Sequence, residues 1–177
     1  MKLHAAVIGG GSWGTTMASL MSRNLPTRLW VRRREIADEI NGANSNERYV
    51  PGCRLSRHLR ASDDMEEVVR ESDLLVVAVP SKGMRDTLAE VARYLRPWVP
   101  VVSLAKGLEP GTRFRMTQVI DELLPKHPSG VLTGPNLALE IAQGYAAASV
   151  LAMEDQTIVE RLQPYFRIFF EIGRAHV

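Results

Sequence analysis

Short apolar segments alternate with amphipathic segments along most of this chain. The apolar segments Leu74–Val79 and Val99–Leu104 hold hydrophobic residues at nearly every position, which is typical of strands covered on both faces. In the amphipathic segments, apolar residues recur three and four positions apart, as on surface helices. This alternation predicts an α/β fold, in which βα units with right-handed crossovers form a Rossmann-like, doubly wound and mostly parallel sheet.

The same pattern gives the expected bounds of the elements. Strands are expected over Leu3–Ile8, Thr27–Val31, Leu74–Val79, Val99–Leu104, Gly130–Leu132 and Ala146–Leu151. Helices are expected over Ser12–Asn24, Arg34–Asn41, Met65–Glu71, Gly83–Leu95, Arg113–Leu124, Leu137–Gln143 and Asp155–Phe166. Several Asn, Pro and Gly residues within Gly42–Arg57 predict a long loop, of the kind that often lines a site.

A glycine-rich run stands between the first expected strand and the first expected helix. It reads Gly9-Gly10-Gly11-Ser12-Trp13-Gly14, with the spacing G-x-G-x-x-G. In this setting the first glycine permits a tight turn, the second lets the backbone approach a pyrophosphate, and the third lets helix pack on strand. The helix N-terminus offers free N–H groups to phosphates. The run therefore predicts a dinucleotide site, with a glycine-rich turn of purely structural function as the alternative.

The end of the second expected strand bears on the identity of the cofactor. NAD-specific folds carry an acidic residue there, about 20 residues beyond the glycines, for the ribose hydroxyls. This chain instead has Arg32, Arg33 and Arg34, and its first acid is Glu35. A guanidinium group pairs with phosphate through two parallel hydrogen bonds, which suits the 2′-phosphate of NADP. We therefore expect NADP as the cofactor, with NAD as an alternative. The arginines also fit a simpler interpretation, in which they form an exposed basic cluster that binds no ligand.

Composition and charge narrow the class of protein. The chain has 177 residues, of which 45% are hydrophobic and 24% charged, as in a globular domain. A net charge of +2 gives no reason to expect a nucleic-acid partner. Cys53 is the only cysteine and the histidines are scattered, so neither a disulfide framework nor a metal site is predicted. We expect no membrane span and no signal peptide, and hence a cytoplasmic protein.

Further motifs follow the glycine turn in order. They are Leu29-Trp30-Val31-Arg32, Tyr49-Val50-Pro51-Gly52, Ala78-Val79-Pro80-Ser81, Ala105-Lys106-Gly107-Leu108-Glu109 and Gly134-Pro135-Asn136-Leu137-Ala138. Over about residues 3–169, the set resembles the bacterial type of NAD(P)-dependent glycerol-3-phosphate dehydrogenase. The resemblance implies reversible hydride transfer between NAD(P)H and dihydroxyacetone phosphate, which gives sn-glycerol 3-phosphate for phospholipid synthesis.

The resemblance also implies roles for individual residues. The implied cofactor contacts are Gly9, Gly11, Ser12, Trp13, Gly14, Arg32, Arg33, Tyr49, Lys106 and Ala138. The implied substrate contacts are Lys106, Gly134 and Asn136, with Lys106 shared between cofactor and substrate. Ser12 and Trp13 are expected beside the pyrophosphate, and Arg32 and Arg33 at the adenosine end.

Simpler interpretations stand beside several of these roles. Lys106 follows a central strand, where it can attract a phosphate or polarise a carbonyl, but surface lysines are common. Asn136 precedes an expected helix and fits an N-cap equally well. Trp13 also fits a side chain that only packs in the core. Tyr49 also fits an aromatic side chain in a loop that covers apolar surface. Pro80 either faces the cofactor or simply ends a strand.

Two other functions remain open from the sequence. One is a related reductase, of the ketopantoate or 6-phosphogluconate type, against which the motifs at Lys106 and Gly134 argue. The other is a nucleotide-binding module without catalysis. The family resemblance implies a second, helical substrate domain with a general acid–base lysine, which this chain lacks. We therefore expect little or no turnover from the chain alone, and a full-length homo-oligomer stays open.

The last residues of the chain do not continue the family pattern. A back-translation of Ile172 to Val177 is ATC GGA AGA GCA CAC GTC, which resembles a common sequencing-library adapter. We therefore expect a dinucleotide-binding domain over residues 1–170, and adapter read-through instead of natural sequence over residues 171–177.

Overall fold

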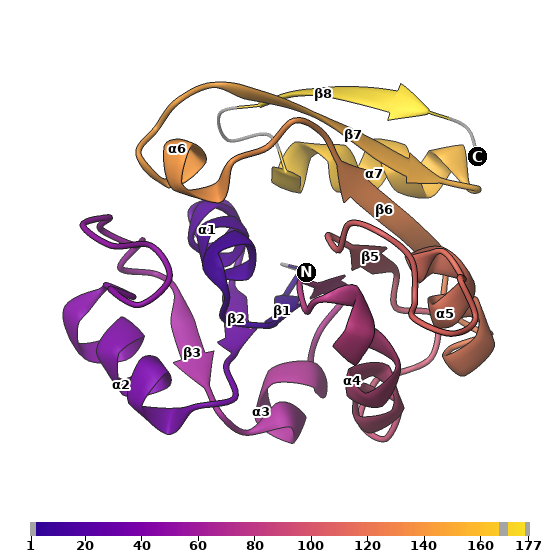
Figure 1. Cartoon of the computed structure of the whole chain (residues 1–177), viewed down its shortest axis with the longest axis horizontal. Coiled ribbons are helices and arrows are strands. Elements are labelled where there is room, and N and C mark those ends of the chain that lie inside the picture. Colours follow the sequence, from indigo (N-terminus) through magenta and orange to yellow (C-terminus); the bar gives the residue numbers. More distant parts are fainter. Residues whose placement is uncertain (1–2, 167–169, 176–177) are drawn as a thin grey trace.

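Strands and helices alternate along the residues that the computed structural model describes, 3–166 and 170–175 (Figure 1). The strands are β1 (Ala5–Ile8), β2 (Thr27–Trp30), β3 (Arg60–Ser62), β4 (Leu74–Val77), β5 (Val101–Ser103), β6 (Ser129–Thr133), β7 (Ala147–Met153) and β8 (Phe170–Ala175). The helices are α1 (Ser12–Met21), α2 (Arg34–Ala43), α3 (Met65–Val69), α4 (Met84–Val91), α5 (Met116–Leu123), α6 (Ala138–Ala142) and α7 (Gln156–Phe166), with a 3₁₀ turn, η1, over Ser81–Gly83.

These strands form one sheet in the order β3-β2-β1-β4-β5-β6-β7-β8. Neighbouring strands run parallel except β6 and β7, which are antiparallel. The chain builds outward from β1 through β2 to β3, and then returns to place β4 on the other side of β1. This reversal between β1 and β4 is the topological switch point at which such sheets bind ligands. The predicted doubly wound, mostly parallel sheet is confirmed.

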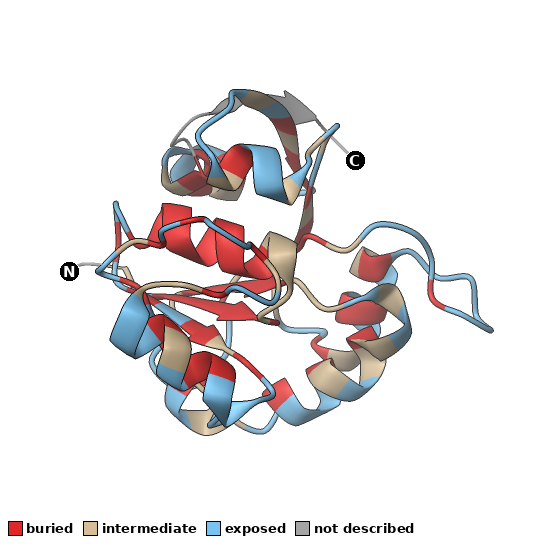
Figure 2. Cartoon of the chain, turned by 60° about the vertical axis from the view of Figure 1, so that its left-hand side comes forward, coloured by how far each residue is buried: buried red, intermediate tan, exposed pale blue. Residues whose placement is uncertain are grey.

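Alternate residues of the central strands feed two separate cores. In β1, Val7 belongs to the core that contains α1, α2, α6 and α7, whereas Ile8 belongs to the core that contains α3, α4 and α5. Because successive side chains of a strand point to opposite faces, apolar residues at every position require a helix layer on each side. Figure 2 shows the buried strands between the helices, whose outer surfaces are exposed.

Two of the differences between the expected and the observed elements have identifiable reasons. The strand β3 was not predicted, because Arg60–Ser62 offers a single apolar residue, Ala61, and no usable alternation. Helix α5 begins at Met116 and not at Arg113. Arg113 has a φ of 60°, in the left-handed region, and therefore cannot be part of a right-handed helix.

The expected long loop lies between α2 and β3 and is fastened to its neighbours. Asn44 ends α2 in the left-handed conformation, with a φ of 53°. The N–H of Leu55 donates to the Asn44 carbonyl over 2.8 Å, and the N–H of Ser56 donates to Ser19 Oγ on α1 over 2.9 Å. These bonds lay the loop along α1, next to the glycine turn.

Candidate functional site

A cavity of about 540 Å³ opens at the carboxyl ends of β1, β2 and β4, beside the switch point. Its volume is in the range of small-molecule sites. The lining residues come from the glycine turn, the end of β2, the loop after α2 and the end of β4; they are Gly9, Gly10, Gly11, Ser12, Trp13, Trp30, Val31, Arg32, Arg33, Ile36, Tyr49, Ala78, Val79 and Pro80. Most of the expected cofactor contacts therefore share one cavity.

The first and third glycines of the turn are required by close packing. Gly9 has a φ of 114°, and its N–H donates to the Trp30 carbonyl over 3.0 Å. A Cβ on Gly9 would come within 3.1 Å of the Ala78 backbone, and a Cβ on Gly14 would overlap the Gly9 carbonyl oxygen. Helix α1 can therefore approach β1 and β4 only because these residues have no side chain.

The second glycine faces open space. A Cβ on Gly11 would meet no atom within 4 Å, and Gly11 lines the cavity. Gly11 is also the N-cap of α1, no side chain caps this helix end, and its first turn has no acidic residue. The free N–H groups and the positive end of the helix dipole are thus available to an anion. The residues present therefore fit a pyrophosphate, with Gly11 leaving room for it.

Two cationic side chains line the cavity beyond β2. Arg32 and Arg33 are exposed, and neither forms an ion pair within residues 3–166. The indole N–H of Trp30 donates to the Asp63 carbonyl over 3.1 Å, which fixes the ring at the cavity wall. Unpaired guanidinium groups at this position suit a phosphate monoester.

The other expected site residues form a second group, at the ends of β5 and β6. Lys106 Nζ donates to the Gly134 carbonyl over 3.1 Å, although 28 residues separate them. Asn136 Nδ2 donates to Ser149 Oγ over 2.8 Å, and its buried Oδ1 has no partner. This group lies at the same edge of the sheet as the cavity but does not line it.

Helix α6 links this second group to the glycine turn. Thr16 Oγ1 on α1 donates to the Ala138 carbonyl over 3.2 Å. Helix α6 starts at Ala138, its N-cap is Leu137, and no side chain caps it. The N-cap interpretation of Asn136 is therefore wrong; its Nδ2 is bonded to Ser149, and only its Oδ1 has no partner.

An ionic network fastens the loop that carries Lys106. Arg85 on α4 donates to both carboxylate oxygens of Glu109 over 2.8 and 3.0 Å, and also to Glu122 on α5. Thr112 Oγ1 donates to Glu109 Oε2 as well, over 2.5 Å. The hydrogen bonds from Arg85 and Thr112 lower the pKa of Glu109, and the bond from Arg85 lowers that of Glu122. The loop after β5 is thus bound to α4 and, through Arg85, connected to α5.

This network predicts a loss of stability in acid. A carboxyl whose pKa is depressed by folding stabilises the protein above its ordinary pKa of 4.5, and this stabilisation disappears as the pH falls through the folded-state pKa. Glu109→Gln should therefore lower the Tm at pH 7, and the difference from wild type should shrink between pH 5 and 3. Thermal melts across this range measure the effect, with the exposed Glu90→Gln on α4 as control. A difference independent of pH would contradict this account.

Some residues around the cavity were not assigned to the site from the sequence. Trp30 is the last residue of β2 and Val79 lies two residues after β4, and this closeness to strand ends was an available signal. Asn46 is completely buried and contacts the glycine turn, but no local sequence pattern predicts a contact between residues so far apart in the chain. Pro80, for which two interpretations stood open, lies on the cavity wall.

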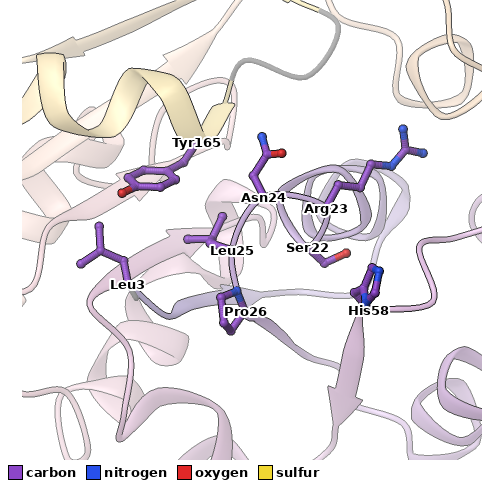
Figure 3. A pocket seen from close by; sticks show the side chains of 8 residues that line it. All are labelled: Leu3, Ser22, Arg23, Asn24, Leu25, Pro26, His58 and Tyr165. Carbon is purple, nitrogen blue, oxygen red and sulfur yellow. The ribbon is translucent and has the colours of Figure 1, made fainter. Parts of the chain in front are cut away.

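A second hollow, of about 580 Å³, lies at the opposite ends of the strands, where β1, β2 and β3 begin (Figure 3). Leu3, Pro26 and His58 lie one or two residues before β1, β2 and β3. They line the hollow together with Ser22, Arg23, Asn24, Leu25 and Tyr165. None of the expected site residues lies there. Because open α/β sheets bind ligands at the carboxyl ends of their strands, the first cavity is the functional candidate.

Two further observations concern only the described residues. No helix among them combines the length and hydrophobicity that a membrane span needs. No group of three or more His, Cys, Asp and Glu side chains within 3–166 could hold a metal ion.

The sheet order, the switch-point cavity and the glycine turn define a Rossmann-like nucleotide-binding domain. Within this class the chain belongs to the family described as NAD-dependent glycerol-3-phosphate dehydrogenase N-terminus, whose model matches residues 4–159. The resemblance seen in the sequence is thereby confirmed.

Individual relatives agree with this family. The chain is 56% identical over 162 residues to glycerol-3-phosphate dehydrogenase [NAD(P)+] of Mycobacterium avium strain 104, a match that covers 91% of this chain and 48% of that protein. It is 53% identical over 166 residues to a glycerol-3-phosphate dehydrogenase [NAD(P)+] of Sphingopyxis alaskensis, covering 94% and 50%. The crystal structure of glycerol-3-phosphate dehydrogenase from Coxiella burnetii matches with a TM-score of 0.91 at 26% identity, covering 98% of this chain and 54% of that one. The chain spans about half the length of the curated relatives it matches.

Proposed function

We propose that this chain is the cofactor-binding half of an NAD(P)-dependent glycerol-3-phosphate dehydrogenase. The complete protein would interconvert dihydroxyacetone phosphate and sn-glycerol 3-phosphate in the cytoplasm, as a supply for glycerophospholipid synthesis. The observation that carries the proposal is the open space over Gly11 at the N-terminus of α1, inside a cavity lined by most of the other expected cofactor residues. The membership of the glycerol-3-phosphate dehydrogenase family supports the choice of reaction.

The residues of this chain bind and orient the reactants. The backbone of Gly11 and the first turn of α1 hold the pyrophosphate, while Arg32 and Arg33 hold a 2′-phosphate. The bound nicotinamide supplies or accepts the hydride. Lys106 places a positive charge at the edge of the sheet, next to Gly134, where it stabilises negative charge on the substrate. The Oδ1 of Asn136 is buried without a partner and would accept a hydrogen bond from the substrate once binding exposes it.

Cofactor titration of the 177-residue chain tests the proposal. Trp13 and Trp30 line the cavity, so their fluorescence reports on ligand binding there. Trp98→Phe removes the exposed third tryptophan and lowers the background. We expect saturable quenching by both NADP⁺ and NAD⁺, with the lower Kd for NADP⁺. No response to either nucleotide would sink the proposal, and a lower Kd for NAD⁺ would overturn the interpretation of the arginines.

We propose further that catalysis requires residues outside this chain. General acid–base groups typically contribute a factor of about 10² to 10⁴ in rate, and we assign this role to a lysine of the second domain. The 177-residue chain should therefore bind NADPH yet oxidise it with dihydroxyacetone phosphate at a barely measurable rate. Clear turnover by this chain would refute the assignment.

We also propose that residues 171–177 are adapter read-through and that the natural domain extends to about residue 170. The support is the correspondence between the back-translated codons of Ile172 to Val177 and a sequencing adapter. Strand β8 does not bear on this question, because its backbone pairing with β7 constrains the residue types only weakly. Resequencing the gene from source DNA tests the proposal; the same codons in that DNA would overturn it.

A further inference from the structure

The side chain of Asn46 is completely buried between the loop after α2 and the glycine turn. Its Nδ2 donates to Thr15 Oγ1 over 2.9 Å and to the Gly10 carbonyl over 3.3 Å. Thr15 Oγ1 donates to the same carbonyl over 3.1 Å. The Gly10 carbonyl oxygen is therefore held by two donors from two different elements.

This arrangement fixes the orientation of the peptide between Gly10 and Gly11. A trans peptide is planar, and its carbonyl and N–H point in opposite directions. Gly11 lines the cavity, whereas Thr15 and Asn46 do not. The two donors that hold the Gly10 carbonyl on the buried side therefore turn the Gly11 N–H toward the cavity.

The amide of Asn46 has only one suitable orientation. A carbonyl oxygen accepts hydrogen bonds but cannot donate one, so the nitrogen of the amide must face Gly10. The Oδ1 atom is then left buried without a partner. An unsatisfied buried acceptor destabilises the fold, and an apolar residue kept only for packing would avoid it. The amide is thus better explained by its bond to the turn than by packing.

Asn46 also connects the turn to a second part of the cavity wall. Its own carbonyl accepts hydrogen bonds from the N–H groups of Tyr49 and Val50 over 3.1 and 2.8 Å. Tyr49 lines the cavity, and Val50 is buried in the core beneath it. Asn46 therefore joins the glycine turn, through its side chain, to the backbone of Tyr49 in the cavity wall, through its carbonyl.

We propose that Asn46 is a positioning residue for the cofactor pyrophosphate, acting through the Gly10–Gly11 peptide. This inference rests on the proposed function, because it concerns the same cavity. Asn46 does not touch the cofactor; it directs the backbone donor that does. Its removal leaves that peptide free to rotate, so a phosphate must fix the peptide again on binding.

Asn46→Asp tests the inference, because a carboxylate has nearly the same shape but cannot donate to the Gly10 carbonyl. Losing one oriented hydrogen bond to a charged group corresponds to about a tenfold or larger rise in Kd. We expect this rise for NADP⁺ and no comparable rise for adenosine 2′-monophosphate, which lacks the pyrophosphate. Both are measured on the 177-residue chain, NADP⁺ by tryptophan quenching and adenosine 2′-monophosphate by competition.

Asn41→Asp is the control for the substitution itself. Asn41 Nδ2 donates to the Ala61 carbonyl over 2.8 Å, and the Ala61 N–H donates back to Asn41 Oδ1, so the same substitution breaks an amide-to-carbonyl bond away from the cavity, at an exposed residue. We expect unchanged Kd values for both nucleotides. Asn46→Asp also places a negative charge near the pyrophosphate, so Thr15→Val, which removes the second donor to Gly10 without adding charge, is measured beside it and should also raise the Kd of NADP⁺ alone. Thr15→Val is the sole test if Asn46→Asp does not fold.

Three outcomes separate this inference from the proposed function. A wild-type chain that binds neither nucleotide overturns the proposed function itself. A wild-type chain that binds NADP⁺, with folded variants that bind it equally well, overturns the role of Asn46. An equal rise in Kd for NADP⁺ and adenosine 2′-monophosphate also overturns that role, because it shows general damage to the cavity instead of lost pyrophosphate positioning.

Discussion

Replacing Gly14 with alanine should destabilise the fold severely, whereas the same replacement at Gly11 should leave the fold intact and remove cofactor binding. The Cβ of an alanine at position 14 would overlap the Gly9 carbonyl oxygen and lie 2.9 Å from Ala78 Cβ. These atoms belong to the turn and to the end of β4, and they cannot move unless α1 leaves the sheet. Overpacking of this kind destabilises by about 3 kcal/mol or more, a large part of the total stability of about 5–15 kcal/mol.

At position 11, alanine should leave the stability unchanged and weaken cofactor binding instead. Gly11 has a φ of −72°, which any residue adopts, and a Cβ there meets no atom within 4 Å. The free energy of unfolding should stay within about 0.5 kcal/mol of wild type. The added methyl group occupies the space through which a pyrophosphate reaches the backbone, so the Kd for NADP⁺ should rise about tenfold or more.

Denaturant unfolding followed by circular dichroism, together with NADP⁺ titration, measures both effects. Gly42→Ala is the control, because Gly42 lies inside α2 and its added Cβ would meet no atom within 4 Å. That variant should unfold at a slightly higher denaturant concentration than wild type, because alanine favours a helix more than glycine does. It should bind NADP⁺ with the wild-type Kd. Normal stability of Gly14→Ala, or normal binding by Gly11→Ala, would contradict the roles given to these two glycines.

The contrast between Gly14 and Asn46 shows what the sequence could reveal. The roles of the three glycines follow from a local pattern, because strand, turn and helix are consecutive in the chain. The contact between Asn46 and Gly10 joins residues 36 positions apart, through a loop without periodicity, and depends on how that loop lies along α1. A single sequence holds no physical signal for such a contact.

The strands likewise include some that a local sequence pattern predicts and others that it does not. Both faces of β4 are buried, so its continuous apolar residues were sufficient to predict it. The edge strand β3 has one buried residue, Ala61, and is held by backbone pairing with β2 more than by its own side chains. Backbone pairing depends little on residue type, which is why β3 was missed.

The expected meeting of Lys106 with the Gly134 motif had a topological reason. Both residues follow parallel strands, β5 and β6, which are neighbours in the sheet, and carboxyl ends of neighbouring parallel strands lie side by side. The hydrogen bond from Lys106 to the Gly134 carbonyl is the result. The topology does not predict the role of Asn136 in the same way. The N-cap interpretation could be rejected only once the structure showed that the N-cap of α6 is Leu137.

Cofactor preference should depend on two arginines more than on any other side chains of the cavity. Arg32 and Arg33 line its wall, are exposed, and have no ion-pair partner in the part of the chain that is described up to residue 166. A 2′-phosphate placed between them forms charge-assisted hydrogen bonds with both. Each such bond is equivalent to about a tenfold change in Kd or more, so Arg32→Ser combined with Arg33→Ser should weaken NADP⁺ about a hundredfold.

NAD⁺ lacks the 2′-phosphate, so its Kd should change little in the double variant, and the preference for NADP⁺ should disappear. Because both side chains are exposed, the preference of the wild-type chain should also decline as salt rises from 0.05 to 0.5 M. Arg34→Ser is the control, since Arg34 is adjacent and exposed but does not line the cavity. A double variant that keeps the wild-type ratio of Kd values, or an equal loss in Arg34→Ser, would show that net positive charge near α2, and not a phosphate site at the end of β2, sets the cofactor preference.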